Sequence, residues 1–380
     1  MTTHHEIAII GAGLGGLTLA RILHVNGIEA AVYDLDASPD ARSQGGMLDI
    51  HEGSGQVALR AAGLYEDFRA IVHQGGEAMR IIDQHAVVRF ADDGEDDHGR
   101  PEVNRRSLRD LLLNSLPEGM VRWGAKVTGA RSLGAGRHEV TVADGSTFTT
   151  DLLIGADGAW SKVRPLVSAA KPVYSGLSFV ELSIEDADNR HPVSAELVGA
   201  GMMFALGDGK GFLGHRDPDG SLHIYVALKT SADWATSGEI DFSDVDKAKQ
   251  VLDELFSDWH EDLRRFISEA DGELVPRPIH ALPVGHRWDR VPGVTLLGDA
   301  AHLMSPFAGE GANLAMLDGA ELAAAVVANP GRVEAALAQY EAPLFPRSEA
   351  SAQGSADNLV LSFAPDSPQG LLDFFAQIHH

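Results

Sequence analysis

The chain has 380 residues, of which 44% are hydrophobic and 22% charged, a composition typical of a folded globular protein and a length that suggests two domains. The 55 acidic and 30 basic residues give a formal net charge of −25, which repels nucleic acid and anionic membranes and makes a small molecule the expected partner. The chain contains no cysteine, which excludes disulfides, thiol nucleophiles, iron–sulfur clusters and thiolate zinc sites.

The first predicted elements are a strand, a tight turn and a helix. Residues 6–10 (EIAII) are apolar, residues 11–16 (GAGLGG) follow directly, and apolar residues at helical spacing continue to a stop at Gly27. A second strand, residues 29–33, ends on Asp34. Because the first strand begins so early, we see no room for a secretory leader before it, and we find no apolar run of the ~20 residues that a membrane span needs. We therefore expect a cytoplasmic protein.

In the middle of the chain, predicted helices and strands alternate, as in an α/β protein. We predict a helix over 56–70, a strand over 81–90, a solvated acidic loop over 91–100, a helix over 104–116 and strands within 140–154. From 174 to 229 short strands alternate with turns such as Asp208-Gly209 and Asp219-Gly220, a pattern typical of an antiparallel sheet. We then expect helices over 243–270, a buried strand over 294–297, a long alanine-rich helix over 311–328 and a helical tail.

The glycine-rich turn predicts a dinucleotide site. Gly11, Gly13 and Gly16 form a G-x-G-x-x-G pattern between a strand and a helix, and Asp34 follows 18 residues after the last glycine. Glycines in this pattern permit the tight turn, the approach of a pyrophosphate and the packing of helix on strand, while the helix N-terminus offers free N–H groups. Asp34 is expected to hold a ribose hydroxyl. The alternative, a glycine-rich turn without a ligand, is the weaker interpretation in this context.

A second half-site distinguishes a flavin from a nicotinamide nucleotide. Asp299 directly follows the predicted strand over 294–297, and Gly311 and Ala312 begin the long helix behind it. A carboxylate at a strand end can bind a sugar-alcohol hydroxyl, and a helix start can stabilise an anionic ring edge. This combination suits a ribityl chain and a flavin ring. Asp157, in the turn of GADGAWSKVR, is a third candidate at a strand end.

Together, the glycine fingerprint, GADGAWSKVR and GDAAHLMSPFAGEGAN resemble the FAD-dependent aromatic hydroxylases of the para-hydroxybenzoate hydroxylase fold. Within that superfamily, GGMLDIHEGSGQ and VNRRSLRDLLLNSLP are similar to the tetracycline-inactivating monooxygenases of the Tet(X) type. The resemblance implies an α/β fold with a discontinuous Rossmann-type FAD-binding domain (1–170 and 275–330), an inserted antiparallel β-sheet substrate domain (171–274) and a C-terminal helical segment (331–380) that bridges them.

The same resemblance implies the reaction. FAD is the cofactor, NAD(P)H and O2 are co-substrates, and one oxygen atom enters an aromatic or polycyclic, tetracycline-like substrate through a hydroperoxide at flavin C4a. No side chain is then needed as a catalytic nucleophile, which agrees with the absence of a G-x-S-x-G elbow. With no H-E-x-x-H motif we expect no metal, and with no second glycine fingerprint we expect NAD(P)H to dock transiently. The partners are an aromatic or polyketide small molecule and O2, without nucleic acid or membrane.

The resemblance also implies cofactor contacts at the positions of this sequence that match the family's motifs. The resemblance implies that Asp49, Arg105 and Asp299 contact FAD and that Arg42 lies at the phosphates of FAD or of the nicotinamide nucleotide. Arginine suits bidentate phosphate contact, which independently supports Arg42 and Arg105 in this acidic chain. The competing interpretations are ordinary surface arginines and a turn-forming aspartate at Asp49.

The substrate contacts depart from the Tet(X) pattern. His223 matches a histidine that contacts the antibiotic, but Glu181 replaces a glutamine, Met202 an arginine and Tyr225 a glycine, which changes both charge and volume. We also expect Phe212, Phe307 and Phe363 to line an apolar pocket, with ordinary core as the alternative. Two other functions stay open: a flavin protein that sequesters a drug without turnover, and a hydroxylase of a different phenolic substrate.

Overall fold

The computed structural model describes residues 3–41, 46–73, 76–94 and 99–378, which fold into two compact units. The first unit comprises Met1–Val72, Arg105–Val173 and His280–Ser355, and the second comprises His73–Asn104, Tyr174–Ile279 and Ala356–His380. The expected α/β class with an antiparallel sheet inserted into a Rossmann-type domain is confirmed. The division differs from the expected boundaries because residues 73–104 join the second unit.

A seven-stranded sheet forms the centre of the first unit. Its strand order is β8-β2-β1-β11-β10-β9, and β17 pairs with β11. β1 runs parallel to both β2 and β11, and β17 runs parallel to β11, whereas β10 and β9 extend the sheet in antiparallel fashion. Its strands are β1 (Thr3–Ile10), β2 (Ala31–Tyr33), β8 (Val121–Arg122), β9 (Val127–Gly134), β10 (Arg137–Val142), β11 (Thr147–Gly155) and β17 (Val294–Leu296).

The apolar ends of the parallel strands explain the buried centre of this sheet. The last four residues of β1 are buried, and so are the last four of β11 and all three of β17. Strands covered on both faces need continuous apolar runs, and these three segments supply them. Because β1, β11 and β17 are parallel neighbours, the turns that follow them lie at the same edge of the sheet.

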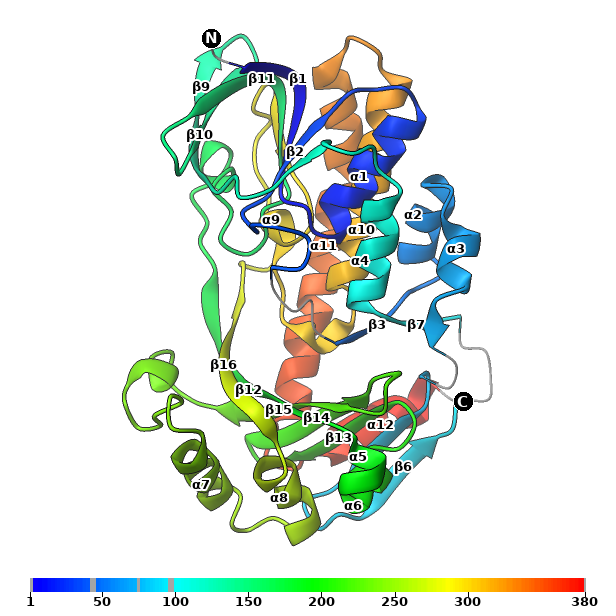
Figure 1. The fold of residues 1–380 in the computed structure, drawn as a ribbon, viewed down its shortest axis with the longest axis vertical. Coiled ribbons are helices and arrows are strands. Elements are labelled where there is room, and N and C mark those ends of the chain that lie inside the picture. Colours follow the sequence, from blue (N-terminus) through cyan, green and yellow to red (C-terminus); the bar gives the residue numbers. More distant parts are fainter. Residues whose placement is uncertain (1–2, 42–45, 74–75, 95–98, 379–380) are drawn as a thin grey trace. The chain divides into compact units, whose positions relative to one another are not determined.

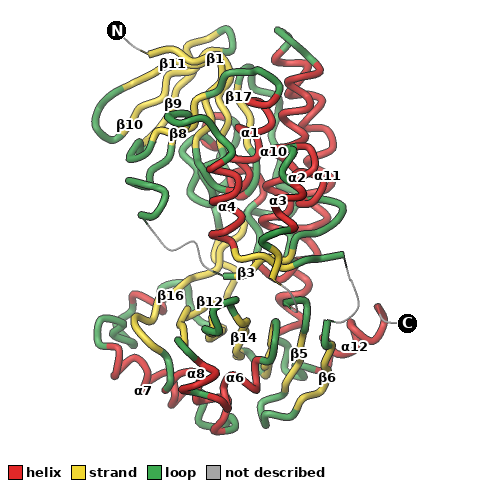
Figure 2. Tube along the Cα trace, turned by 45° about the vertical axis from the view of Figure 1, so that its right-hand side comes forward, coloured by secondary structure: helices red, strands yellow, loops and turns green. Residues whose placement is uncertain are grey.

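Helices cover this sheet, and two of them cross closely. α1 (Leu14–Val25) packs against α10 (Gly311–Ala328), as Figures 1 and 2 show. A Cβ on Gly15 would lie 2.6 Å from the Ala315 carbonyl oxygen, and one on Gly319 would lie 2.6 Å from the Gly15 carbonyl oxygen. Glycine at both positions therefore lets the two backbones touch. α10 is long and apolar enough to cross a membrane, but most of its residues are buried in this unit, which is typical of a core helix.

The remaining elements of the first unit are shorter, apart from one long helix. α11 has 30 residues, and the boundary between the two units falls within it. α11 spans Val333–Ser362. The others are β3 (Met47–Asp49), α2 (Gly55–Ala61), α3 (Tyr65–Arg69), β4 (Val72–His73), α4 (Arg105–Asn114), η1 (Arg164–Leu166), α9 (Asp299–His302) and η3 (Pro306–Ala308).

A second seven-stranded sheet, in the order β16-β12-β15-β14-β13-β5-β6, organises the second unit. β12, β15, β14 and β13 pair in antiparallel fashion and so do β5 and β6, whereas β13 runs parallel to β5. The segment expected as one strand over 81–90 is instead a hairpin, because the Asp83 carboxylate accepts hydrogen bonds from the backbone N–H groups of His85 and Val87 and closes a turn. The strands are β5 (Met79–Ile82), β6 (Val88–Asp92), β12 (Val173–Ile184), β13 (Met202–Gly207), β14 (Lys210–Arg216), β15 (Leu222–Lys229) and β16 (Asp271–Ala281).

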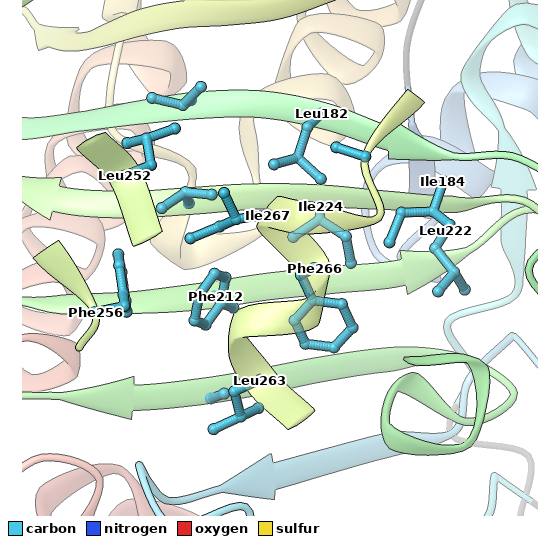
Figure 3. Packing of buried hydrophobic residues seen from close by; sticks show 14 of the residues in the cluster. Leu182, Ile184, Phe212, Leu222, Ile224, Leu252, Phe256, Leu263, Phe266 and Ile267 are labelled. Carbon is cyan, nitrogen blue, oxygen red and sulfur yellow. The ribbon is translucent and has the colours of Figure 1, made fainter. Parts of the chain in front are cut away.

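The two faces of this sheet differ. One face carries Val180, Leu182, Ile224 and Val226, which pack against α7 and α8 in a buried core cluster (Figure 3). Asp244 caps the N-terminus of α7, because its carboxylate accepts from the Lys247 backbone N–H. The other face carries the alternate residues, among them the substrate candidates described below. The remaining elements are β7 (Glu102–Asn104), α5 (Ala187–Arg190), α6 (Pro192–Val198), η2 (Trp234–Thr236), α7 (Val245–Leu255), α8 (Glu261–Ser268) and α12 (Gln369–Ile378).

Candidate cofactor and substrate sites

The three fingerprint glycines have different surroundings. Gly11 has φ +113°, and a Cβ there would lie 2.2 Å from the Ala156 carbonyl oxygen. A Cβ on Gly16 would lie 2.1 Å from the Gly11 carbonyl oxygen, whereas one on Gly13 would meet nothing within 4 Å. Gly11 and Gly16 are therefore required by the fold itself. Gly13 is not, and the open space beside it is where a phosphate can approach the backbone.

The N-terminus of α1 is suited to an anion. Gly13 caps the helix, no side chain accepts from its first N–H groups, and its first turn contains no acidic residue. The N–H groups of that turn are therefore available to a ligand and carry the positive end of the helix dipole. This is the arrangement that binds pyrophosphate in dinucleotide folds.

Asp34 is tied to the same turn. Its Oδ2 accepts from the Ala12 backbone N–H at 2.6 Å and its Oδ1 accepts from the Asp36 backbone N–H at 2.8 Å. Carboxylate oxygens accept more than one hydrogen bond, so this geometry is compatible with the expected ribose contact. A buried arginine that sequence reasoning missed completes the turn: Arg109 donates to the carbonyl oxygens of Ala12 and Pro39. Its only sequence signal is its place one helical turn after Arg105.

The Asp157 carboxylate stabilises the turn in which it lies. Its Oδ1 accepts from the Ser161 hydroxyl at 2.6 Å and its Oδ2 from the Lys162 backbone N–H at 2.6 Å. Burial raises the pKa of this carboxyl, although the two hydrogen bonds act to lower it. The structure thus gives Asp157 a turn-forming role, and its expected contact with the cofactor stays a prediction.

Arg164 joins two of the strand-end turns, a role that the sequence did not suggest. Its guanidinium donates to the carbonyl oxygens of Ala159, in the turn after β11, and of Asp299 and Ala300, in the turn after β17. Burial lowers the pKa of Arg164, which the nearby Asp157 and Asp299 oppose. The two turns are therefore held together within the first unit.

The Asp299 turn is fixed from behind by a buried charge network. The Asp318 carboxylate accepts from the Gly298 backbone N–H at 2.9 Å, from His302 Nε2 at 2.6 Å and from the Arg347 guanidinium at 2.9 Å. Burial favours the neutral form of both His302 and Asp318. The Asp318 carboxylate nevertheless raises the pKa of the His302 imidazole, and His302 in turn lowers the pKa of Asp318. The Asp299 side chain is exposed and makes no hydrogen bond within the described part of the chain, so it is free to bind a ligand.

Asp49 belongs to a cluster at the start of α10. The His51 imidazole contacts Asp49 through Nε2 at 2.8 Å and Glu310 through Nδ1 at 3.3 Å. Asn313, in the first turn of α10, donates to the Asp49 carbonyl oxygen and accepts from the His51 backbone N–H. Although burial favours the neutral imidazole, the two carboxylates raise the pKa of His51 to about 9. Sequence reasoning had missed His51, Glu310 and Asn313.

The N-terminus of α10 is open in the same way as that of α1. No side chain caps it, and its first turn contains no acidic residue. A Cβ on Gly311 would meet nothing within 4 Å, and Gly311 and Ala312 are both partly exposed. These positions therefore leave backbone N–H groups for an anionic ring edge.

Of the two expected arginines, one can be placed. Arg105 begins α4, and its Nε is buried without a hydrogen-bond partner in the described part of the chain. A buried donor without an acceptor is costly, which is consistent with a ligand that supplies one. Arg42 lies outside the described residues.

Four of the substrate candidates share one face of the second unit's sheet. In the pairing of β12 with β15, Glu181 lies opposite Tyr225, and His223 lies two residues before Tyr225 on the same face. Met202, on β13, pairs with His215, which itself pairs with His223. Sequence reasoning missed Arg277 of β16, whose Nε donates to Glu181 Oε2 at 2.7 Å.

The expectation for Phe212 was wrong. Because Phe212 pairs with Val226, it lies on the opposite, helix-covered face of the sheet, where its ring contacts Phe256, Trp259 and Phe266. It is fully buried and presents no surface to a substrate. Figure 3 shows its ring beside those of Phe256 and Phe266.

The other two phenylalanines lie in different units. Phe363 is fully buried in the second unit, and its carbonyl oxygen accepts from Lys229 Nζ. Phe307 lies in the first unit, within η3, and is partly exposed. Pocket membership stays a prediction for both.

The sequence and the fold can now be compared with known proteins. A model of the FAD binding domain family matches residues 4–355. The chain belongs to this family. Monooxygenase penA of Penicillium thymicola is 31% identical over 427 residues, with 97% of this chain and 98% of penA covered. Like the relatives so named, the chain is an enzyme of the FAD-dependent monooxygenase class.

Solved structures share the fold of this family member. Klebsiella pneumoniae HpxO complexed with FAD and uric acid superposes with a TM-score of 0.80 at 24% identity, covering 98% of this chain and 92% of HpxO. The tetracycline destructase Tet(51) superposes with a TM-score of 0.72 at 19% identity, covering 100% of this chain and 96% of Tet(51). The broad resemblance to FAD-dependent monooxygenases is therefore confirmed, whereas the narrower likeness to tetracycline-inactivating enzymes is one of fold alone.

The candidate site in the first unit fits FAD, as three observations indicate. Space is open beside Gly13, the Arg105 Nε lacks a partner in the described part of the chain, and the Asp299 carboxylate is exposed and unoccupied there. These are, in turn, a place for phosphate, a donor for an anion and an acceptor for hydroxyl groups. Within the described residues, no group of three histidine and acidic side chains is arranged to hold a metal ion.

Proposed function

We propose that this protein inserts one oxygen atom from O2 into an aromatic or polycyclic small molecule, using FAD as cofactor and NAD(P)H as reductant. The observation that carries the proposal is the convergence of three turns, those after β1, β11 and β17, at one edge of a parallel sheet, with Arg164 joining two of them. A relative that supports the substrate class is the 3-amino-4-hydroxybenzoate 2-monooxygenase of Streptomyces cremeus, 29% identical over 96% of this chain and 89% of that protein.

When bound, FAD supplies the redox and oxygen-transfer chemistry of this class. The chain supplies binding and orientation. The N–H groups at the start of α1 would hold the pyrophosphate, Asp34 a ribose and Asp299 the ribityl hydroxyls, while the N–H groups at the start of α10 would stabilise negative charge on the ring. Asp49 and Arg105 complete the proposed cofactor contacts.

This division of labour explains why no nucleophilic side chain is required. The chain must place the substrate, exclude water and hold the cofactor, and the motifs found serve binding. We propose that Glu181, Met202, His223 and Tyr225 orient the substrate from the second unit's sheet. Tetracyclines belong to the polycyclic compounds to be tested, and a cytoplasmic location stays a prediction.

The test is incorporation of oxygen. The purified protein, loaded with FAD, is incubated under ¹⁸O2 with NADH or NADPH and a panel of phenols, fused heteroaromatics and tetracyclines, and products are analysed by mass spectrometry. One ¹⁸O atom in a product, with substrate-stimulated NAD(P)H oxidation, supports the proposal. FAD and substrate binding without any oxygenated product would support the sequestering alternative, and failure to bind FAD would overturn the proposed function.

A further inference from the structure

The face of the second unit's sheet opposite the α7 and α8 core carries a polar cluster among apolar side chains. Alternation along the strands places Met202 and Phe204 of β13, Leu213 of β14 and Tyr225 of β15 on this face, all partly exposed, while the residues between them are buried in the core. Partial exposure on one face only is what a surface for a small ligand requires.

On this face, at the edge of the sheet formed by β16 and β12, a carboxylate and a guanidinium are already paired. Arg277 Nε donates to Glu181 Oε2 at 2.7 Å, and Glu181 Oε1 lies 3.4 Å from His223 Nε2. The Arg277 side chain is 57% exposed and the Glu181 side chain 20% exposed. The pair has no net charge, so the one arginine in this cluster is already neutralised by a carboxylate.

The two histidines of the cluster add no positive charge near pH 7. Their rings stack with centroids 5.1 Å apart, and His223 meets Tyr225 edge-on at 4.8 Å. Burial, with the neighbouring His223, lowers the pKa of His215 to about 3. Burial also lowers the pKa of His223. Glu181 raises this pKa and Arg277 lowers it, and the net shift is downward. Both imidazoles are therefore neutral.

Hydrogen-bonding capacity nevertheless remains on this face. His223 is 6% exposed, and its Nε2 is buried without a hydrogen-bond partner in the described part of the chain. Arg277 donates to Glu181 through its Nε, and within the described part of the chain its terminal nitrogens make no hydrogen bond. A ligand with a neutral carbonyl, amide or phenol group can satisfy these atoms without separating the ion pair.

We propose that this face selects an uncharged aromatic substrate with a polar carbonyl, amide or hydroxyl group, and that Glu181 is the residue that rejects carboxylates by occupying Arg277. The inference deepens the proposed function and rests on it. A carboxylate ligand would have to compete with Glu181 for the guanidinium and would place two carboxylates side by side, which is unfavourable in a partly buried site. Removing the charge of Glu181 should therefore release Arg277 for an anionic ligand.

Matched ligands test this selection directly. The FAD-loaded protein is titrated with 4-hydroxybenzamide and 4-hydroxybenzoate, and with quinoline-4-carboxamide and quinoline-4-carboxylate. Within each pair the two ligands have nearly the same shape, and one carries a neutral amide where the other carries a negative carboxylate. Dissociation constants are measured by calorimetry at pH 7.5. We expect the wild-type protein to bind each amide about tenfold more tightly than its carboxylate, as charge repulsion at a partly buried site predicts.

The variant Glu181→Gln keeps the shape and removes the charge. It should bind the carboxylates about tenfold more tightly than the wild type while its affinity for the amides changes by less than about threefold. Glu185→Gln, an exposed position directly after β12, is the matched control and should change neither. Unchanged FAD affinity in all three proteins verifies that they are folded.

The outcomes separate this inference from the proposed function. Equal binding of amide and carboxylate by the wild type, no binding of either, or no gain for carboxylates in Glu181→Gln would each overturn the inference. These measurements involve no turnover. A protein that shows the expected charge preference but never incorporates ¹⁸O would retain the inference about ligand charge and lose the oxygenase function.

Discussion

His51 and Asp49 are joined by a contact of 2.8 Å between the imidazole Nε2 and the carboxylate Oδ2. Glu310, one residue before α10, approaches the other ring nitrogen, so a single imidazolium links the β3 segment to the start of α10. The proposed ring-binding end of the cofactor site is therefore organised by a cation that lies between two acidic groups.

This arrangement predicts a pH-dependent stability. The pKa of His51 is raised from about 6.5 to about 9, so its stabilising contribution is complete below pH 6.5 and is lost as the pH rises through 9. The shift corresponds to at most about 3 kcal/mol. We expect the free energy of unfolding of the apo protein, measured with urea between pH 6 and 9.5, to fall over this window. His51→Gln should flatten the fall, whereas His24→Gln, at an exposed position of α1, should leave it intact.

The fingerprint glycines provide a second test, because two of them serve the fold and one serves the ligand. Gly13 has φ −79° and ψ 178°, an ordinary extended conformation, and open space for a Cβ. Gly13→Ala should change the unfolding free energy by less than about 1 kcal/mol but weaken FAD binding at least about tenfold by blocking the phosphate approach. A variant that binds FAD as tightly as the wild type would remove Gly13 from the site.

Gly16→Ala should behave in the opposite way. Its Cβ would meet the Gly11 carbonyl oxygen at 2.1 Å, and neither backbone can move without shifting α1. We expect a loss of about 1–3 kcal/mol of stability in the apo protein, the range for overpacked interiors. Denaturant titrations of the two variants side by side separate the structural glycine from the binding glycine.

The buried network around Asp318 gives a third prediction. Asp318→Ala would leave the buried His302 imidazolium and the partly buried Arg347 guanidinium without their shared carboxylate, and it would remove the acceptor of the Gly298 N–H. Breaking a buried ion pair from one side costs about 3–5 kcal/mol, and the loosened turn should also weaken FAD binding through Asp299. Glu321→Gln, which removes only the more exposed partner of Arg347, should cost about 1 kcal/mol or less.

The sequence predicted the elements whose signals are local. The strand, glycine turn and helix at residues 6–27 follow from apolar runs and from the spacing of the glycines, and the Asp34 carboxylate at the end of the next strand accepts a hydrogen bond from that turn. The long helix over 311–328 was predicted with the bounds that α10 has, because its alanine-rich sequence contains no proline.

What the sequence could not supply was pairing between distant residues. In the sequence, nothing distinguishes Arg109, Arg164 and Arg277 from other arginines. In the fold, each donates to a carbonyl or carboxylate oxygen of a residue 70 to 136 positions away. His51 likewise acquires its elevated pKa from Glu310, which is remote in the chain. Hydrophobic alternation also left open which face of a strand is the core, and so Phe212 was assigned to the substrate instead of to the helices.

That error yields the last prediction, which distinguishes the two faces of one sheet. Phe212 is fully buried against Phe256 and Phe266, whereas Tyr225, on the neighbouring strand, is partly exposed on the opposite face. Phe212→Ala should lower the unfolding free energy by about 3–5 kcal/mol, the cost of a large cavity in a packed core. Tyr225→Phe retains the ring, so it should cost less than about 1 kcal/mol and alter ligand affinity instead. Urea denaturation and ligand titration of both variants measure the two effects. A destabilised Tyr225→Phe protein with unchanged ligand affinity would assign Tyr225 to the core and remove it from the substrate face.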